Sequence, residues 1–488
     1  MVKRALLGGL FGLALLTGCR QAEEGAVHVT VIGGRAEVVD PAAGPLDPDQ
    51  AVLLSNVAQG LVRLDALGNI EPGLAERWNV SDDGLSYIFR LATGEWPSGR
   101  KIMARDVAAI LKRQLARQSR NSLKDTVGAI AEVVPMTERV IEIRLVAPRP
   151  QLLQLLAQPE FAMVREGEGT GPFELKDSSR SSEALLLERN LPVPDGDEPI
   201  EERVELTGMD AAAAIRSFVA GETDLVLGGT FADLSLALGA QLPRGSLRFD
   251  PVAGLFGLAP ARATGPLAEL EVRALLDQAI DRAALVAALG VADLEPRSSI
   301  LQPGLDGVSL PTVPGWAAVP LTDRRAALAA EAERLFGDER PTIRLAMPKG
   351  PGSTIVLERL RADWGALGIS VELAGRGAPA DLRLVDLVAP SSSPAWFLRQ
   401  FRCDVAAVCS EQADQLLAAA RSTLFAPQRN ALLAEAERQM REAVLFVPLA
   451  APVRWSLVRR DIPGFAENRF GHHPLTGLRD RLSVQGSQ

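Results

Sequence analysis

The chain carries two kinds of apolar pattern, and each predicts a different kind of element. Apolar residues alternate with polar or small ones over residues 27–31 and 140–146, which predicts a strand in each segment. Between residues 78 and 91 the same alternation surrounds the turn sequence Asp82-Asp83-Gly84, which predicts a β-hairpin. A helix is predicted from about Ala104, with Asp106 in its first turn, where a negative charge suits the helix dipole.

Two longer segments combine both patterns in the order strand, helix, strand. The first places strands at residues 204–206 and 224–227 around a helix over residues 211–220, which Gly221 would end. The second shows alternation over residues 343–347 and 369–373, and apolar residues at steps of three and four between them: Leu357, Leu360, Trp364 and Leu367. Parallel strands joined by a helix imply an α/β layer. Because the two units lie far apart in the sequence, we expect two α/β lobes rather than one long sheet.

The N-terminus predicts export and a lipid anchor. A positive pair, Lys3-Arg4, precedes an apolar stretch shorter than the ~20 residues that a membrane-spanning helix needs. The stretch ends in Leu16-Thr17-Gly18-Cys19, which resembles the lipobox of bacterial lipoproteins, whose cysteine thiol takes up a diacylglyceryl group. We therefore expect a signal peptide at residues 1–18, lipidation of Cys19 and a tether at residues 19–26. The alternative is an ordinary cleaved signal in which Cys19 is incidental.

Composition and charge exclude several classes of function. A chain of 488 residues is too long for one compact core, so two or three domains are expected. The net charge is −9, and the absence of a Lys/Arg-rich run argues against a nucleic-acid-binding protein. The glycine run at Gly167 to Gly171 is not clearly followed by a helix, so a structural turn is favoured over a phosphate-binding loop. The sequence offers no nucleophile elbow around Ser391 to Ser393, and we expect neither an enzyme nor a cofactor.

Two cysteines remain after the lipobox, and they lie close together. Nearby cysteines in an exported protein usually form a disulfide, which is the pairing predicted for Cys403 and Cys409. A zinc site would need about four ligands, and no histidine lies near this pair in sequence. The adjacent histidines His472-His473 could ligate a metal, but without further ligands nearby a surface or turn role is favoured. We therefore predict no metal site.

Several short motifs occur in a fixed order along the chain. They are Gly73-Leu74-Ala75-Glu76-Arg77-Trp78, Ser81-Asp82-Asp83-Gly84-Leu85, Ala104-Arg105-Asp106-Val107, Gly169-Thr170-Gly171-Pro172-Phe173, Gly221-Glu222-Thr223-Asp224, Val272-Arg273-Ala274-Leu275 with Ala279-Ile280-Asp281-Arg282, and Ile462-Pro463-Gly464-Phe465. Together they resemble the bacterial extracellular solute-binding proteins of family 5, which include the oligopeptide- and dipeptide-binding components of ABC importers. The resemblance runs from about Val27 to Leu478.

This resemblance implies a fold and a domain plan. The fold class is α/β, a two-lobed periplasmic-binding-protein fold of the class II type with an additional inserted subdomain. A discontinuous lobe Ia would comprise residues 27–46, 167–253 and 444–488, with an inserted lobe Ib at residues 47–166 and a lobe II at residues 254–443. Family members capture a solute in the cleft between lobes, which close by a hinge motion.

The resemblance also implies partners and a location. We expect a lipid-anchored, monomeric periplasmic protein that captures peptides or peptide-like solutes and presents them to an ABC permease in the inner membrane. It would touch the membrane through its lipid only and would not bind nucleic acid. Arg20 stands where an aspartate would signal inner-membrane retention, so the outer membrane is the preferred site of anchoring.

Two segments match the ligand-binding positions of the family. On the lobe Ia side, residues 33–41 match a pocket-lining strand that contributes Arg35, Ala36 and Glu37. In lobe II the corresponding residues are Asp386, Leu387, Val388 and Trp396, although Trp396 could equally belong to the core.

The lobe II segment departs from the peptide-binding pattern. Peptide-binding members often place an aspartate there, which pairs with the ligand's free amino group, but Pro390 occupies that position here. Asp386 is the candidate replacement from a shifted register. Because Arg35 stands where relatives can carry an acidic residue, the sequence predicts an anionic or neutral ligand. The alternatives are a non-peptide solute, such as an opine or a metal complex, and a structural or sensory lipoprotein without an import role.

Overall fold

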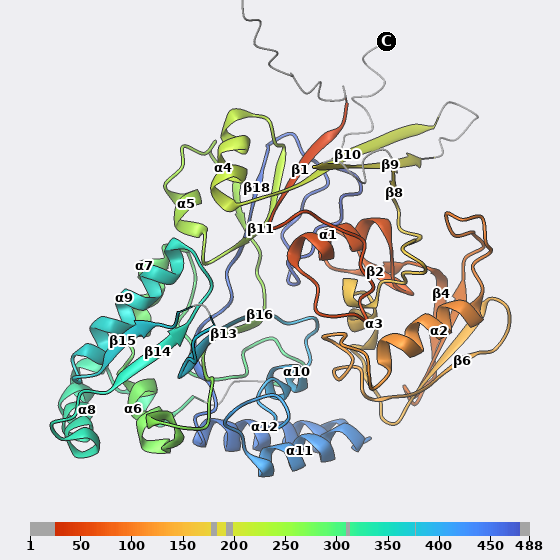
Figure 1. Ribbon diagram of the computed structural model, residues 1–488. Helices are drawn as coiled ribbons and strands as arrows, with labels where there is room; N and C mark the ends of the chain where they lie inside the picture. Colours follow the sequence, from red (N-terminus) through yellow and green to blue (C-terminus); the bar gives the residue numbers. More distant parts are fainter. Residues whose placement is uncertain (1–24, 177–182, 192–198, 309–312, 376, 479–488) are drawn as a thin grey trace, which may run out of the picture.

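The computed structural model describes residues 25–176, 183–191, 199–308, 313–375 and 377–478, which build three larger sheets and one two-stranded sheet (Figure 1). The predicted lipidation site, Cys19, lies outside the described residues. Within them, no helix combines the length and apolar character that a membrane span requires.

A seven-stranded sheet, at the top of Figure 1, has the order β12-β18-β11-β1-β10-β9-β8. Its strands are β1 (Val27–Ile32), β8 (Glu174–Leu175), β9 (Ala184–Leu191), β10 (Ile200–Met209), β11 (Leu225–Thr230), β12 (Leu247–Phe249) and β18 (Arg454–Val458). Strands β10 and β11 both run parallel to β1, which lies between them, and α4 (Ala211–Ala220) connects the two. The Asp210 carboxylate accepts the Ala213 amide at the start of α4, and Gly221 ends it with a φ of 78°. The first predicted strand-helix-strand unit is confirmed.

A four-stranded antiparallel sheet, β4-β5-β7-β6, forms the right side of the molecule in Figure 1. Its strands are β4 (Ala75–Val80), β5 (Ser86–Leu91), β6 (Ile130–Pro135) and β7 (Val140–Leu145), and β2 (Val62–Leu64) pairs separately with β3 (Ile70–Pro72). The predicted hairpin is confirmed: Gly84 has a φ of 67°, and the Asp83 carboxylate accepts the Leu85 amide. Helices α2 (Ala104–Leu115) and α3 (Leu152–Leu156) share the apolar core of this part, whereas α1 (Pro48–Val57) contributes Leu53 and Val57 to the core of the seven-stranded sheet.

A five-stranded sheet has the order β15-β14-β16-β13-β17. Its strands are β13 (Gly254–Pro260), β14 (Thr342–Ala346), β15 (Ser370–Leu373), β16 (Leu382–Val388) and β17 (Val447–Ala450). Strands β14 and β15 are parallel and are joined by α9 (Pro351–Gly365), which confirms the second predicted unit. Trp364 of α9 is fully buried and donates its indole N–H to the Leu276 carbonyl.

The remaining helices lie around the two α/β sheets. They are α5 (Leu234–Leu238), α6 (Leu270–Ala279), α7 (Arg282–Leu289), α8 (Leu321–Phe336), α10 (Pro394–Arg399), α11 (Glu411–Ser422) and α12 (Ala426–Glu442). Helices α10 to α12 form the bottom of the molecule in Figure 1 and share an apolar core with β13 and β16.

The chain passes between the seven-stranded and the five-stranded sheet through short segments. Residues 250–253 connect β12 to β13, and residues 451–453 connect β17 to β18. Strand β17 pairs with β13 in the five-stranded sheet, whereas the predicted boundary at residue 444 groups it with the first lobe. The lobe boundaries stay a prediction. At β17 the sheet pairing and the predicted boundary differ, because the pairing groups this strand with the five-stranded sheet.

Candidate functional site

A cavity of about 320 Å³ lies between the part built on the four-stranded sheet and the helices α10 to α12. One wall comes from segments between Thr126 and Leu155, and the other from residues 306–307, 393–399 and 417–433. Its apolar lining includes the side chains of Leu155, Trp396, Leu417 and Leu433. Segments far apart in the sequence therefore enclose one volume, as expected for a solute site between two lobes.

Three glutamines beside this cavity join its two walls. Gln151, Gln154 and Gln158 are spaced by three and four residues along α3 and its ends, so they share one face. Their partners lie in the opposite wall or in the segment that leads into it at residue 393. They are the carboxylate of Asp306 for Gln151, the amide of Ser392 for Gln154 at 3.2 Å, and the carbonyl of Pro390 for Gln158 at 3.0 Å. The structure thus shows the two walls in direct polar contact.

Four arginines line the same cavity: Arg149 from the segment before α3, Arg399 from α10, Arg421 from α11 and Arg429 from α12. All four are half-buried. Burial and the nearby charges of Arg429 and Arg421 lower the pKa of Arg149 to about 10. Burial, together with Arg421 and Arg402, lowers the pKa of Arg399 to about 9. The cavity is therefore a region in which positive charge is concentrated and poorly solvated.

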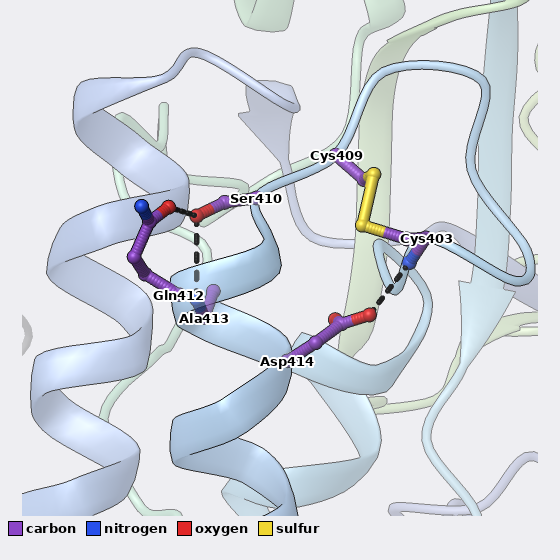
Figure 2. The surroundings of a disulfide bond; sticks show 6 residues. All are labelled: Cys403, Cys409, Ser410, Gln412, Ala413 and Asp414. Carbon is purple, nitrogen blue, oxygen red and sulfur yellow. Dashed lines mark hydrogen bonds between the residues drawn. A yellow bond between two sulfur atoms is a disulfide. The ribbon is translucent and has the colours of Figure 1, made fainter.

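A disulfide joins Cys403 to Cys409 immediately before α11 (Figure 2). The Cys403 amide donates to the Asp414 carboxylate at 3.0 Å, and the Ser410 hydroxyl accepts the Ala413 amide at 3.2 Å, capping the helix. These contacts fix the start of the helix whose later turns carry Leu417 and Arg421 into the cavity. The short loop thus positions part of the cavity wall.

The candidate anchor Asp386 is engaged with another side chain. It lies on β16, and both of its carboxylate oxygens accept from the Arg454 guanidinium, at 2.9 and 3.0 Å. Burial raises the pKa of Asp386, and the charge of Arg454 opposes that shift. Since Arg454 begins β18, this ion pair connects the five-stranded sheet to the seven-stranded one.

The other predicted ligand residues have different surroundings. Arg35 and Glu37 are exposed and lie 3.5 Å apart, while Ala36 is buried in the core of the seven-stranded sheet. None of the three lines the cavity, and neither do Leu387 and Val388, of which Leu387 is 39% exposed. Trp396 lines the cavity and is also buried against Phe397, so both of its predicted roles apply. The structure therefore brings one of the seven predicted ligand residues to this cavity.

The adjacent histidines lie away from this cavity. His473 contacts the Asp250 carboxylate at 3.1 Å and stacks on Phe465. Burial, with the charge of His473, lowers the pKa of His472 to about 4. In the part of the chain that the structure describes, no three His, Cys, Asp or Glu side chains gather as a metal site would require.

Most of the chain is similar in sequence to known solute-binding proteins. Residues 69–396 match the family model described as bacterial extracellular solute-binding proteins, family 5. Di/tripeptide-binding protein 1 of Pseudomonas aeruginosa is 23% identical over 530 aligned residues, covering 96% of this chain and 97% of the relative.

Solved structures of other binding proteins have a fold similar to that of this chain. Haemophilus influenzae OppA in complex with RPPGFSPFR has a TM-score of 0.80 at 16% identity, covering 93% of this chain and 99% of that one. AgaA of A. tumefaciens R10, solved in complex with agropinic acid, has a TM-score of 0.71 at 18% identity, covering 91% and 96%. These likenesses confirm the predicted fold class, the α/β two-lobed periplasmic-binding-protein fold.

Proposed function

We propose that this chain, which belongs to the bacterial extracellular solute-binding proteins of family 5, captures a peptide or peptide-like solute between its lobes and delivers it to an ABC permease. The observation that carries the proposal is the cavity of about 320 Å³ enclosed by two walls that hydrogen-bond to each other. A relative that aligns along almost the whole chain is named as a di/tripeptide-binding protein, which supports a small peptide as the default ligand.

The inter-wall hydrogen bonds supply a mechanism for capture. Gln151, Gln154 and Gln158 reach their partners only when the two walls approach, so they stabilise the closed arrangement. A solute that contacts both walls adds free energy to the same arrangement and shifts the population toward it. The permease would then recognise the closed form.

The proposal includes the location of the protein. Lipidation of Cys19 would hold a monomer at the membrane surface, with the outer membrane preferred because Arg20 follows the cysteine. The test is metabolic labelling with a fatty acid in the native host: Cys19→Ala should lose the label and be recovered in the soluble periplasmic fraction. Label retained by Cys19→Ala would contradict the lipid anchor.

Capture of a non-peptide solute is the second candidate function. It is favoured because the described residues offer no free carboxylate at the position where peptide-binding relatives hold the ligand's amino group. Pro390 occupies the usual position of the anchoring aspartate, and its carbonyl accepts from Gln158. Asp386, the replacement suggested by the sequence, is paired with Arg454. A solute without a free amino group would need neither residue.

Native mass spectrometry of the soluble form from Gln21 onward, purified from its host's extract, separates these functions. A co-purifying peptide mass that is lost on denaturation would support peptide capture. A non-peptide mass would select the second candidate. An empty protein that also shows no thermal shift with peptide and metabolite pools would contradict solute capture and favour a structural or sensory lipoprotein without an import role.

A further inference from the structure

The cavity between the walls contains more positive charge than the protein itself neutralises. Its lining has four arginines and a single carboxylate, that of Asp306. Asp306 already accepts from Gln151 and from the Ser392 hydroxyl. Among the described residues, no ion pair joins Arg149, Arg399, Arg421 or Arg429 to a carboxylate.

The acidic groups that act on Arg399 from outside the cavity lining are paired with another arginine. Asp125 and Asp404 act on Arg399 only through space, because both contact the guanidinium of Arg402, at 3.7 and 2.7 Å. The Nη2 atom of Arg399 is buried and has no hydrogen-bond partner among the described residues. A buried charged donor without an acceptor costs free energy that a bound anion would recover.

The four guanidinium groups repel one another across the cavity. Arg421 lowers the pKa of both Arg149 and Arg399, and Arg429 lowers that of Arg149, so the groups interact as one cluster. The Arg149 guanidinium donates to the carbonyl oxygens of Pro148 and Arg421, which orients it but leaves its charge in place. Such a cluster stays unfavourable until counter-charge enters the cavity.

We propose that the cavity selects a small organic anion with two or more carboxylate groups, bound by Arg149, Arg399, Arg421 and Arg429. Guanidinium groups bind carboxylates through two parallel hydrogen bonds, which gives strength and orientation. The apolar side chains of Trp396 and Leu417 would contact the carbon body of the solute. A volume of about 320 Å³ suits a small solute, since ligand pockets commonly span ~300–1,000 Å³.

This inference rests on the proposed capture function and narrows its ligand class. Two sources carry the same chemistry: a short acidic peptide and a non-peptide dicarboxylic acid. The probes are therefore glutamyl-glutamate, glutarate and, as the neutral comparison, alanyl-alanine. Titration calorimetry on the chain from Gln21 onward measures the affinity for each.

The variants Arg399→Gln and Arg421→Gln each remove one positive charge and leave a shorter but still polar side chain. Each should weaken binding of the anionic probe by ~10- to 100-fold, the effect of losing one charge-assisted interaction. Arg438→Gln is the matched control, because Arg438 lies on α12 with Arg429 but pairs with Glu435 and Glu442 outside the cavity. It should change affinity by less than about twofold, and the thermal unfolding midpoint of all three variants verifies that they fold.

The outcomes separate the ligand class from the capture function. Tight binding of glutamyl-glutamate or glutarate that both cavity variants weaken supports the proposal, and the preferred probe identifies the source. Alanyl-alanine binding as tightly as glutamyl-glutamate, or anion binding unchanged in both variants, would overturn the anionic ligand class while leaving solute capture intact. If no probe binds and the protein from its host is also empty, solute capture itself is contradicted.

Discussion

The side-chain amide of Gln158 donates a hydrogen bond to the carbonyl of Pro390 over 3.0 Å, and the two residues are separated by 232 positions in the sequence. Gln158 is only 2% exposed, and the same amide nitrogen also donates to the Gln154 carbonyl of its own wall at 3.0 Å. The hydrogen bond to Pro390 is therefore the one that depends on the closed arrangement of the two walls. In an open arrangement both polar groups would be solvated by water.

We predict that Gln158→Ala shifts the protein toward open forms. Loss of one neutral hydrogen bond costs ~0.5–1.5 kcal/mol, so solute affinity should fall by about 2- to 13-fold, mainly through faster dissociation. Stopped-flow binding kinetics measure the dissociation rate, and small-angle X-ray scattering measures the larger radius of gyration of the unliganded protein. Gln439→Ala is the control, since Gln439 contacts Glu435 on its own helix. Equal dissociation rates for Gln158→Ala and wild type would contradict the closure role.

The pair formed by Asp386 and Arg454 gives a second prediction, on stability. Asp386→Ala leaves the partly buried Arg454 guanidinium without its carboxylate, and the expected loss of unfolding free energy is about 2–3 kcal/mol, somewhat less than for a fully buried pair. Urea unfolding checks this value. Glu435→Ala, which breaks an exposed pair with Arg438, should cost less than ~1 kcal/mol.

The same variant tests the alternative role of Asp386. If Asp386 were the anchor for a peptide amino group, Asp386→Ala would abolish peptide binding at nearly unchanged stability. We expect the reverse: a clear loss of stability with solute affinity largely retained. A double-mutant cycle with Arg454→Met would measure the coupling between the two residues directly.

Much of the secondary structure could be predicted from the sequence, because the residues that start and end these elements lie next to them in the chain. Asp210 and Gly221 bracket α4 within a few turns, and alternation around Gly84 places a hairpin without reference to the rest of the chain. The sheet to which β17 belongs could not be predicted from local patterns. Val447–Ala450 is buried on all positions, which fits either α/β sheet, and only pairing with the distant β13 assigns it.

The cavity was largely inaccessible from sequence because its charges come from distant segments. Arg149 and Arg399 belong to no shared motif, and each is an ordinary surface-type residue in its local context. Family resemblance drew attention to Arg35 and Asp386, which the structure places outside the cavity lining. Trp396 was found because it adjoins the loop that the family uses for its ligand. A cluster of unpaired arginines is visible only once α10, α11 and α12 are assembled.

The disulfide gives a third prediction, which links stability to the cavity. A loop as short as Cys403 to Cys409 should contribute about 2 kcal/mol through the unfolded state. The double variant Cys403→Ser, Cys409→Ser should lose that amount and should exchange amide hydrogens faster in the first turns of α11. Hydrogen exchange measured by mass spectrometry resolves this region. We also expect weaker solute binding, because α11 carries Arg421. Unchanged exchange in residues 403–414 would show that the Ser410 cap and Asp414 hold the helix start without the disulfide.

The half-buried His472 gives the last prediction, on the pH dependence of stability. Burial and the neighbouring His473 lower the pKa of His472 to about 4, from an ordinary value near 6.5, and Asp250 partly opposes this. Between those pH values the unfolded chain binds a proton that the folded protein does not, so stability should fall as the pH decreases from about 6.5 toward 4. The contribution reaches up to about 3 kcal/mol, since one pKa unit corresponds to ~1.4 kcal/mol.

His472→Gln should flatten this part of the stability–pH curve, which is measured as thermal unfolding midpoints across the range. Above pH 7 the variant should show no pH-dependent difference from wild type. Because carboxylates also titrate in acid, the informative quantity is the difference in unfolding midpoint between His472→Gln and wild type at each pH. Parallel curves for wild type and His472→Gln would mean that His472 titrates normally in the folded protein.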